Sequence, residues 1–197
     1  MYYNQNNVVN KKGKYYLSTN VSTDQESIDL TRFYPESQKG VTIVANSSYS
    51  AGNNTIISSY FNDTITAKNG KYELWLYGNN KKVTTGNFEN KFAIQSNGKS
   101  TINAGDQKDT YSIWAGTNTI VDKGGDNVYK IVSNGTSINK ITNKGGNNTY
   151  KIYSGTNTIV DYGTVDCTIS NGKNNIKVMP IYANKKVQDV KNKLTEM

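Results

Sequence analysis

A seven-residue phrase that occurs twice constrains the fold of this chain more than any other feature of its sequence. Gly-Thr-Asn-Thr-Ile-Val-Asp at residues 116–122 returns letter for letter at residues 155–161. Between the two copies, Gly-Asp-Asn-Val-Tyr-Lys-Ile at 125–131 is echoed by Gly-Asn-Asn-Thr-Tyr-Lys-Ile at 146–152. Repetition at a fixed period indicates that one structural unit is used several times and stacked on itself.

Two interleaved ladders extend the repeat beyond these phrases. The first has the form Gly-x-x-x-Ile, with rungs at Gly98/Ile102, Gly116/Ile120, Gly155/Ile159, Gly172/Ile176 and, one residue early, Gly135/Ile138. The second has the form aromatic-x-aliphatic, with rungs at Tyr72/Leu74, Phe92/Ile94, Tyr111/Ile113, Tyr129/Ile131, Tyr150/Ile152 and a degraded Cys167/Ile169. Successive rungs of the second ladder are 20, 19, 18, 21 and 17 residues apart, so each period holds two short strands and two turns.

Burial explains why such a chain should stack. Residues two apart in a strand share a face, so the Tyr and Ile of each Tyr-Lys-Ile segment point inward and the Lys points to water. One coil cannot bury these side chains alone, whereas a stack of coils can. The pattern predicts an all-β fold, a parallel β-roll or β-solenoid with coils of about 19 residues. An antiparallel hairpin array also gives short, regularly spaced strands, but it has no reason to repeat a seven-letter phrase.

The ladders divide the chain into three parts. Residues 1–39 carry no ladder, and we interpret them as an irregular N-terminal cap or lead-in, because a solenoid must cover its first coil. Residues 40–180 hold the repeats, which are most regular over 96–178. In residues 181–197, the spacing of Val187, Val190 and Leu194 among polar residues predicts a short amphipathic helix that caps the C-terminal end.

The amino-acid composition and charge of the chain exclude several kinds of active site and partner. The chain has no His, which removes Ser-His-Asp and Cys-His catalysis and His-containing zinc sites. Its net charge of +8 is the excess of 22 Lys and a single Arg32 over 15 Asp and Glu, and the Lys are mostly scattered along the strands, so we predict no nucleic-acid partner. No apolar run approaches the roughly 20 residues that cross a bilayer, so we predict no membrane insertion. The start lacks the basic and apolar regions of a signal peptide, which leaves a cytosolic protein, a fragment, or export by an uncleaved signal.

Gly-Gly-Asp-Asn-Val-Tyr-Lys-Ile and Gly-Gly-Asn-Asn-Thr-Tyr-Lys-Ile, alternating with Gly-Thr-Asn-Thr-Ile-Val-Asp, resemble the haemolysin-type calcium-binding repeats of the RTX (repeats-in-toxin) proteins. The likeness is to the degenerate variety of the repeat and covers about residues 96–178 and, with looser repeats, 50–95. It implies a parallel β-roll with calcium bound between the turns of adjacent coils. It also implies a bacterial protein that leaves the cell by type I secretion and works outside the cell or on its surface, as toxins, proteases, lipases, adhesins and surface-layer proteins of the family do.

The turns depart from the family pattern at the residues that would bind calcium. Tyr129 and Tyr150 occupy the register of the family's turn Asp, and Asn127 and Asn148 stand where the degenerate variety has Asp. The acids that remain at corners, and hence the candidate metal ligands, are Asp122 and Asp126 first, then Asp109, Asp106 and Asp161. Because calcium takes six to eight oxygens, single carboxylates per corner predict weak calcium sites, and the alternative is that Asn side chains hold the corners without metal.

These observations predict a non-enzymatic structural or adhesive module of a secreted or surface protein, calcium-stabilised if the corner acids bind. A cell-surface or glycan partner and end-to-end self-association both fit a long, regular polar surface. One alternative is a secreted polysaccharide lyase or hydrolase on a β-helix, although no ladder position carries paired carboxylates on one face. The other is a carbohydrate-binding adhesin module, in which exposed Tyr side chains and Trp114 would stack on sugars.

Overall fold

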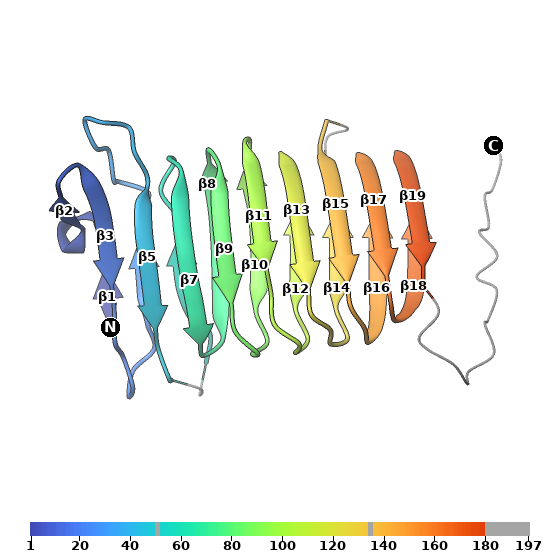
Figure 1. Ribbon diagram of the computed structural model, residues 1–197, viewed down its shortest axis with the longest axis horizontal. Helices are drawn as coiled ribbons and strands as arrows, with labels where there is room; N and C mark the ends of the chain where they lie inside the picture. The colour runs from blue at the N-terminus through green and yellow to red at the C-terminus, as the bar shows by residue number, and fades with distance from the viewer. Residues whose placement is uncertain (50–51, 134–135, 180–197) are drawn as a thin grey trace.

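The computed structural model describes residues 1–49, 52–133 and 136–179, which form two parallel β-sheets facing each other (Figure 1). Each turn of the chain adds one strand to each sheet and advances one step along the molecule's long axis (Figure 1). Within the described residues every strand pair is parallel except the hairpin of β2 and β3. The predicted all-β parallel solenoid is therefore confirmed, and the antiparallel array is wrong.

The strands alternate between the two sheets along the sequence. In the order of pairing, sheet A consists of β1 (Tyr2–Tyr3), β4 (Ser27–Asp29), β6 (Asn54–Ile57), β8 (Tyr72–Gly78), β10 (Lys91–Ser96), β12 (Thr110–Ile113), β14 (Val128–Ile131), β16 (Asn147–Ile152) and β18 (Thr164–Ile169). Sheet B consists of β2 (Val9–Lys11), β3 (Lys14–Ser18), β5 (Val41–Asn46), β7 (Asp63–Asn69), β9 (Lys81–Thr85), β11 (Lys99–Asn103), β13 (Thr117–Asp122), β15 (Ile138–Asn143), β17 (Thr156–Asp161) and β19 (Lys173–Val178). A 3-10 turn, η1 (Gln5–Asn7), lies between β1 and β2. In the parts of the chain described, no helix is long and apolar enough to cross a membrane.

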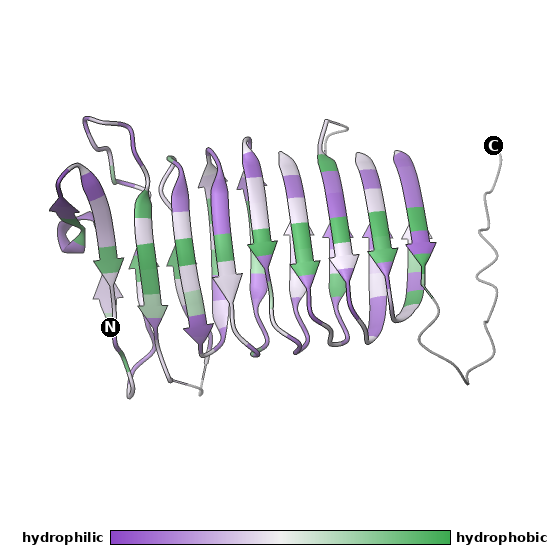
Figure 2. Ribbon diagram, viewed as in Figure 1, coloured by the Kyte–Doolittle hydropathy of each residue, from purple (hydrophilic) through white to green (hydrophobic). Residues whose placement is uncertain are grey.

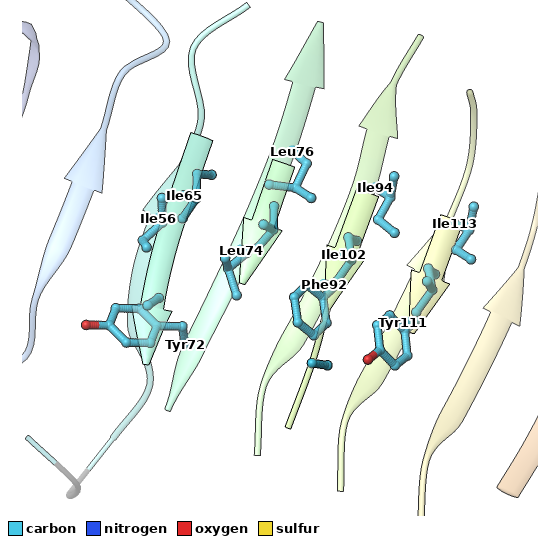
Figure 3. Close-up of a cluster of buried hydrophobic side chains, with 14 of the residues drawn as sticks. Ile56, Ile65, Tyr72, Leu74, Leu76, Phe92, Ile94, Ile102, Tyr111 and Ile113 are labelled. Carbon is cyan, nitrogen blue, oxygen red and sulfur yellow. The ribbon is translucent and has the colours of Figure 1, made fainter. Parts of the chain in front are cut away.

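A narrow apolar stripe runs between the sheets, visible as the aligned green bands of Figure 2 and the inward side chains of Figure 3. Four rings from successive coils stack in it: those of Phe92, Tyr111, Tyr129 and Tyr150, with centroid separations of 4.8, 4.6 and 4.7 Å. Planes of neighbouring rings differ by 5° or less, so each coil repeats the previous one with little twist. The prediction that these tyrosines lie directly over one another is confirmed.

Two rungs of the predicted ladders were in the wrong register. Phe92 pairs with Leu74 rather than with Tyr72, so the column of rings is preceded by an aliphatic residue. Ile141, not Ile138, aligns with the buried isoleucines of the neighbouring strands. Ile138 is 52% exposed, because it lies at an outward position three residues earlier in β15.

The solenoid also begins earlier than residue 40. Strand β3 pairs in parallel with β5, and β4 with β6, so two strands of the segment expected to be a cap belong to the stack. Their inward residues Leu17 and Ile28 are fully part of the core. Only β2, which pairs antiparallel with β3, covers the edge of sheet B at this end. The C-terminal helix expected over 181–197 lies outside the described residues.

The corners require glycine where coils stack most closely. Gly146 has φ +88°, and a Cβ there would lie 1.9 Å from the carbonyl oxygen of Gly125 in the preceding coil. A larger side chain would push the coils apart, besides straining a left-handed backbone. This close approach accounts for the second glycine of each Gly-Gly pair, Gly125 and Gly146.

Candidate functional site

The five acids predicted to bind metal divide between the inside and the outside of the coils. Asp109, Asp122 and Asp161 are fully buried, whereas Asp106 and Asp126 are exposed. The favoured pair, Asp122 and Asp126, thus lies on opposite sides of the coil wall and does not converge. Over residues 1–49, 52–133 and 136–179, no three Cys, Asp or Glu side chains gather in a group that could hold a metal ion.

Asp122 is held by groups of its own coil. The Tyr111 hydroxyl donates to its Oδ2 at 2.6 Å, and the backbone N–H of Gly124 donates to its Oδ1 at 3.0 Å. Burial raises the pKa of Asp122 to about 6, against the lowering effect of these hydrogen bonds. Both carboxylate oxygens are therefore already engaged inside the coil, which leaves neither free to face a turn.

Asp161 repeats this arrangement two coils later. It accepts from the Tyr150 hydroxyl at 2.6 Å, from the Gly163 N–H at 2.7 Å and from Asn148 Nδ2 at 3.1 Å. Burial again raises its pKa, with the same three donors acting in the opposite direction. The duplicated phrase thus encodes a buried tyrosine–aspartate pair in each of two coils.

The coil between them carries Asn143 in register with both acids. Within the described chain, the hydroxyl of the stacked Tyr129 is buried without a hydrogen-bond partner. An amide between two carboxylates keeps like charges about 10 Å apart at the strand spacing of about 4.8 Å. The buried tyrosine hydroxyl thus lacks a hydrogen bond in this coil, whereas it has one in the coils of Tyr111 and Tyr150.

A second polar column lies where the strands of sheet A begin. Each side chain in it accepts the backbone N–H of the preceding coil: Asp109 from Asn90 at 2.7 Å, Asn127 from Asp109 at 2.7 Å, and Asn148 from Asn127 at 3.0 Å. The amide nitrogens of Asn127 and Asn148 also donate to the carbonyls of Gly124 and Gly145. These asparagines hold the Gly-Gly corners by side-chain hydrogen bonds.

Asp109 is the acid in this column of amides. Its Oδ1 accepts as the asparagines do, but its Oδ2 is buried without a partner among the described residues. Burial chiefly raises its pKa to about 8; the charges of Asp122 and Glu89 act in the same direction and the hydrogen bond from Asn90 acts in the opposite one. At neutral pH the carboxyl is therefore protonated and uncharged.

Sheet B carries two further buried polar features. Asn118, Asn139, Asn157 and Asn174 form an amide ladder in which each Nδ2 donates to the Oδ1 of the next coil, at 2.9, 2.7 and 2.7 Å. In earlier coils of the same column, Lys81 forms a buried ion pair with Asp63 at 3.1 Å and donates to the carbonyl of Phe61. Burial lowers the pKa of Lys81, whereas Asp63 acts to raise it. A shallow hollow of about 330 Å³ lies beside this pair.

The outer face of sheet A carries aromatic side chains at the ends of alternate strands. We call Tyr77, Trp114 and Tyr153 the aromatic row; Trp114 is 37% and Tyr153 45% exposed, and Tyr77 is half-buried. Tyr77 also contacts Tyr60, with ring centroids 6.1 Å apart. Sequence reasoning named Trp114 but missed its two partners. The outward position after Ile152 of the ladder could have found Tyr153, but the predicted rung Tyr72/Leu74 placed Trp75, not Tyr77, at that position.

No protein-family model, curated protein or solved structure matches this chain. The likeness to RTX repeats therefore stays a prediction, and function must be argued from the residues themselves. The geometry defines a β-solenoid in which Asp122, Asp161 and the corner asparagines are engaged by contacts within and between coils, and whose outer sheets are regular.

Proposed function

We propose that this chain is a non-enzymatic structural or adhesive module of a bacterial protein that works outside the cell or on its surface. The observation that carries the proposal is the use of polar side chains inside the coils. The buried acids bond to tyrosines, glycine corners and asparagines rather than facing solvent, where a substrate would need them. What remains outside is a pair of regular sheets, suited to spanning a distance or to contacting a partner.

Three of the five acids nominated as calcium ligands, Asp122, Asp126 and Asp161, are already hydrogen-bonded within the chain. Asp122 and Asp161 have both oxygens engaged by donors of the chain, and the exposed Asp126 accepts two hydrogen bonds from Asn147 on a single oxygen. Calcium takes six to eight oxygen ligands, which these carboxylates would not supply without dismantling the corner. We therefore infer that asparagine side chains hold the corners without metal.

A calcium titration tests this part of the proposal. Urea unfolding followed by circular dichroism should give the same midpoint in excess chelator and in millimolar calcium. A midpoint that rises with calcium concentration would mean that the protein binds the ion in its folded state, because a ligand bound only by the native state stabilises it by mass action. Magnesium at the same concentration serves as the control for ionic strength.

Location and catalysis are tested separately. In the bacterium that produces the protein, immunoblots of culture medium, cell surface and cytosol should find it in the first two fractions. Retention in the cytosol would contradict the proposal. The purified chain should not cleave acidic polysaccharides; cleavage that is lost in Asp126→Ala, with Asp106→Ala as the control, would favour a lyase or hydrolase instead.

A further inference from the structure

The aromatic row is locked in register by the backbone. Tyr77 pairs with Gln95 at the ends of β8 and β10. The N–H groups of Trp114 and Tyr153 then donate to the carbonyls of Ile94 and Ile131, which continues the parallel pairing one residue past the strands. The column therefore reads Tyr77, Gln95, Trp114, Val132, Tyr153, with an aromatic residue at every second coil.

The spacing of the row follows from the stacking distance of the coils. Interior rings of successive coils are 4.6–4.8 Å apart. Two coils therefore separate neighbouring members of the row by about 9–10 Å, and the row from Tyr77 to Tyr153 spans about 19 Å. Because the interior rings are within 5° of parallel, the row runs straight along the solenoid instead of twisting around it.

These dimensions match one class of ligand. In an extended β-1,4-linked polysaccharide each sugar is turned over relative to its neighbour, so the same apolar face recurs once per disaccharide, which is about two strand spacings long. Aromatic side chains present a large apolar face with a polar edge, which suits the C–H face of a pyranose ring. A straight, untwisted ribbon of sugar would place equivalent faces over Tyr77, Trp114 and Tyr153 in turn.

Polar groups beside the row can bind the sugar hydroxyls. Ser112, Lys130 and Lys151 lie in register in the neighbouring outward column, and both lysines are exposed. Gln95 lies within the row itself. A hydroxyl, two ammonium groups and an amide thus flank the aromatic rings, as recognition of a polyhydroxylated chain requires.

We propose that the outer face of sheet A binds an extended β-1,4-linked glycan, with the sugar chain lying along the solenoid axis over Tyr77, Trp114 and Tyr153. The inference rests on the proposed adhesive function and names its partner. Trp114 is the central contact, since it lies between the two tyrosines. Because the row spans about 19 Å, it covers about four sugars, and a disaccharide fills only half of it.

Binding to cellulose and chitin, and calorimetry with their oligosaccharides from dimer to hexamer, tests the proposal. We expect the purified chain to bind one or both polymers, and the hexamer to bind at least about tenfold more tightly than the dimer. Trp114→Ala should weaken binding at least about tenfold and Tyr153→Ala less. The control is Tyr162→Ala, since Tyr162 is 40% exposed but lies outside the row. Each variant should retain the circular dichroism spectrum of the parent.

Three results would overturn the glycan site: no binding to either polymer, binding unaffected by Trp114→Ala, or equal binding to amylose, whose α-1,4 linkages do not give an extended ribbon. None of these results would contradict the proposed structural role, which is tested by where the protein is found and by whether it cleaves polysaccharides. Cleavage of the bound polymer, by contrast, would refute the non-enzymatic proposal while leaving the binding face intact.

Discussion

Replacing Asp109 by asparagine should stabilise the protein at neutral pH and leave it almost unchanged in acid. Asn127 and Asn148, in the same column, accept a backbone N–H through Oδ1 and donate from Nδ2 to a carbonyl three residues earlier. Asp109 makes the first bond, but within the described residues its Oδ2 has no partner. Asparagine at 109 would supply the missing donor without any change of shape.

The magnitude follows from the pKa of Asp109, which burial raises from 3.8 to about 8. Between about pH 4 and pH 8 the native state holds a proton that the unfolded state has lost, so stability decreases as pH rises through this window and is level above it. At pH 7 the difference of about three pH units, at roughly 1.4 kcal/mol each, corresponds to about 4 kcal/mol. Asn cannot ionise, so Asp109→Asn should recover about 2–4 kcal/mol at pH 7 and almost none at pH 4.

Urea unfolding of parent and variant between pH 4 and pH 8.5, followed by circular dichroism, measures this difference. Asp106→Asn is the matched control, because Asp106 is exposed and its substitution should give no gain that grows with pH. The reasoning fails if Asp109→Asn is less stable than the parent at pH 7. It also fails if its gain is the same at pH 4 as at pH 7, since ionisation would then play no part.

Three further substitutions probe the buried polar groups by the same assay. Tyr129→Phe should raise the free energy of unfolding by about 1 kcal/mol, because it removes a buried hydroxyl with no partner in the described chain. Tyr111→Phe should lower it by about 1.5–3 kcal/mol, because Asp122 loses its hydrogen-bond donor. If both variants changed stability in the same direction, the assignment of these two hydroxyls would be contradicted. Lys81→Met should cost about 3 kcal/mol or more because it leaves the charge of Asp63 buried and unpaired, and a loss below about 1 kcal/mol would mean that the pair is neutral or solvated.

Alternation within the strands made most of the fold predictable. The repeat of Tyr-Lys-Ile at a near-constant period determined which residues face inward and required coils to stack, and the ring column of Tyr111, Tyr129 and Tyr150 follows from it. Register failed where the sequence offered two equivalent choices. Residues 72–76, Tyr-Glu-Leu-Trp-Leu, offer two rungs: the aromatic-x-aliphatic pair Tyr72/Leu74 and the aliphatic pair Leu74/Leu76. In the structure the pair Leu74/Leu76 lies beside Phe92 and Ile94.

For the candidate metal ligands, the resemblance to a known motif and the inward–outward alternation of the strands predicted different orientations of the side chain. Asp122 was predicted to be a metal ligand at a corner, because Asp-Lys-Gly-Gly-Asp at 122–126 brings two acids to one turn, yet it lies two residues after the buried Ile120 and so shares its inward face. Asp109 likewise precedes Tyr111 by two. Alternation alone could not predict the hydrogen-bond partner of Asp122. The Tyr111 hydroxyl reaches Asp122 because the two sheets face each other across the apolar stripe.

The identity of the residue facing each stacked ring explains why the phrase was duplicated. Phe92 has no hydroxyl, and the position one coil before Asp122 in the facing column is Ala104. Where the ring is Tyr111 or Tyr150, the facing residue is Asp122 or Asp161, which accepts the hydrogen bond of the buried phenol. The coil between them has Tyr129 and Asn143, and that phenol has no hydrogen-bond partner among the described residues. The acids at the ends of the repeated phrases are thus accounted for by the tyrosines opposite, and the asparagines by the glycine corners they hold. Several of the letters that make this sequence resemble a calcium-binding repeat, among them Asp122, Asn148 and Asp161, thus also make hydrogen bonds within and between coils.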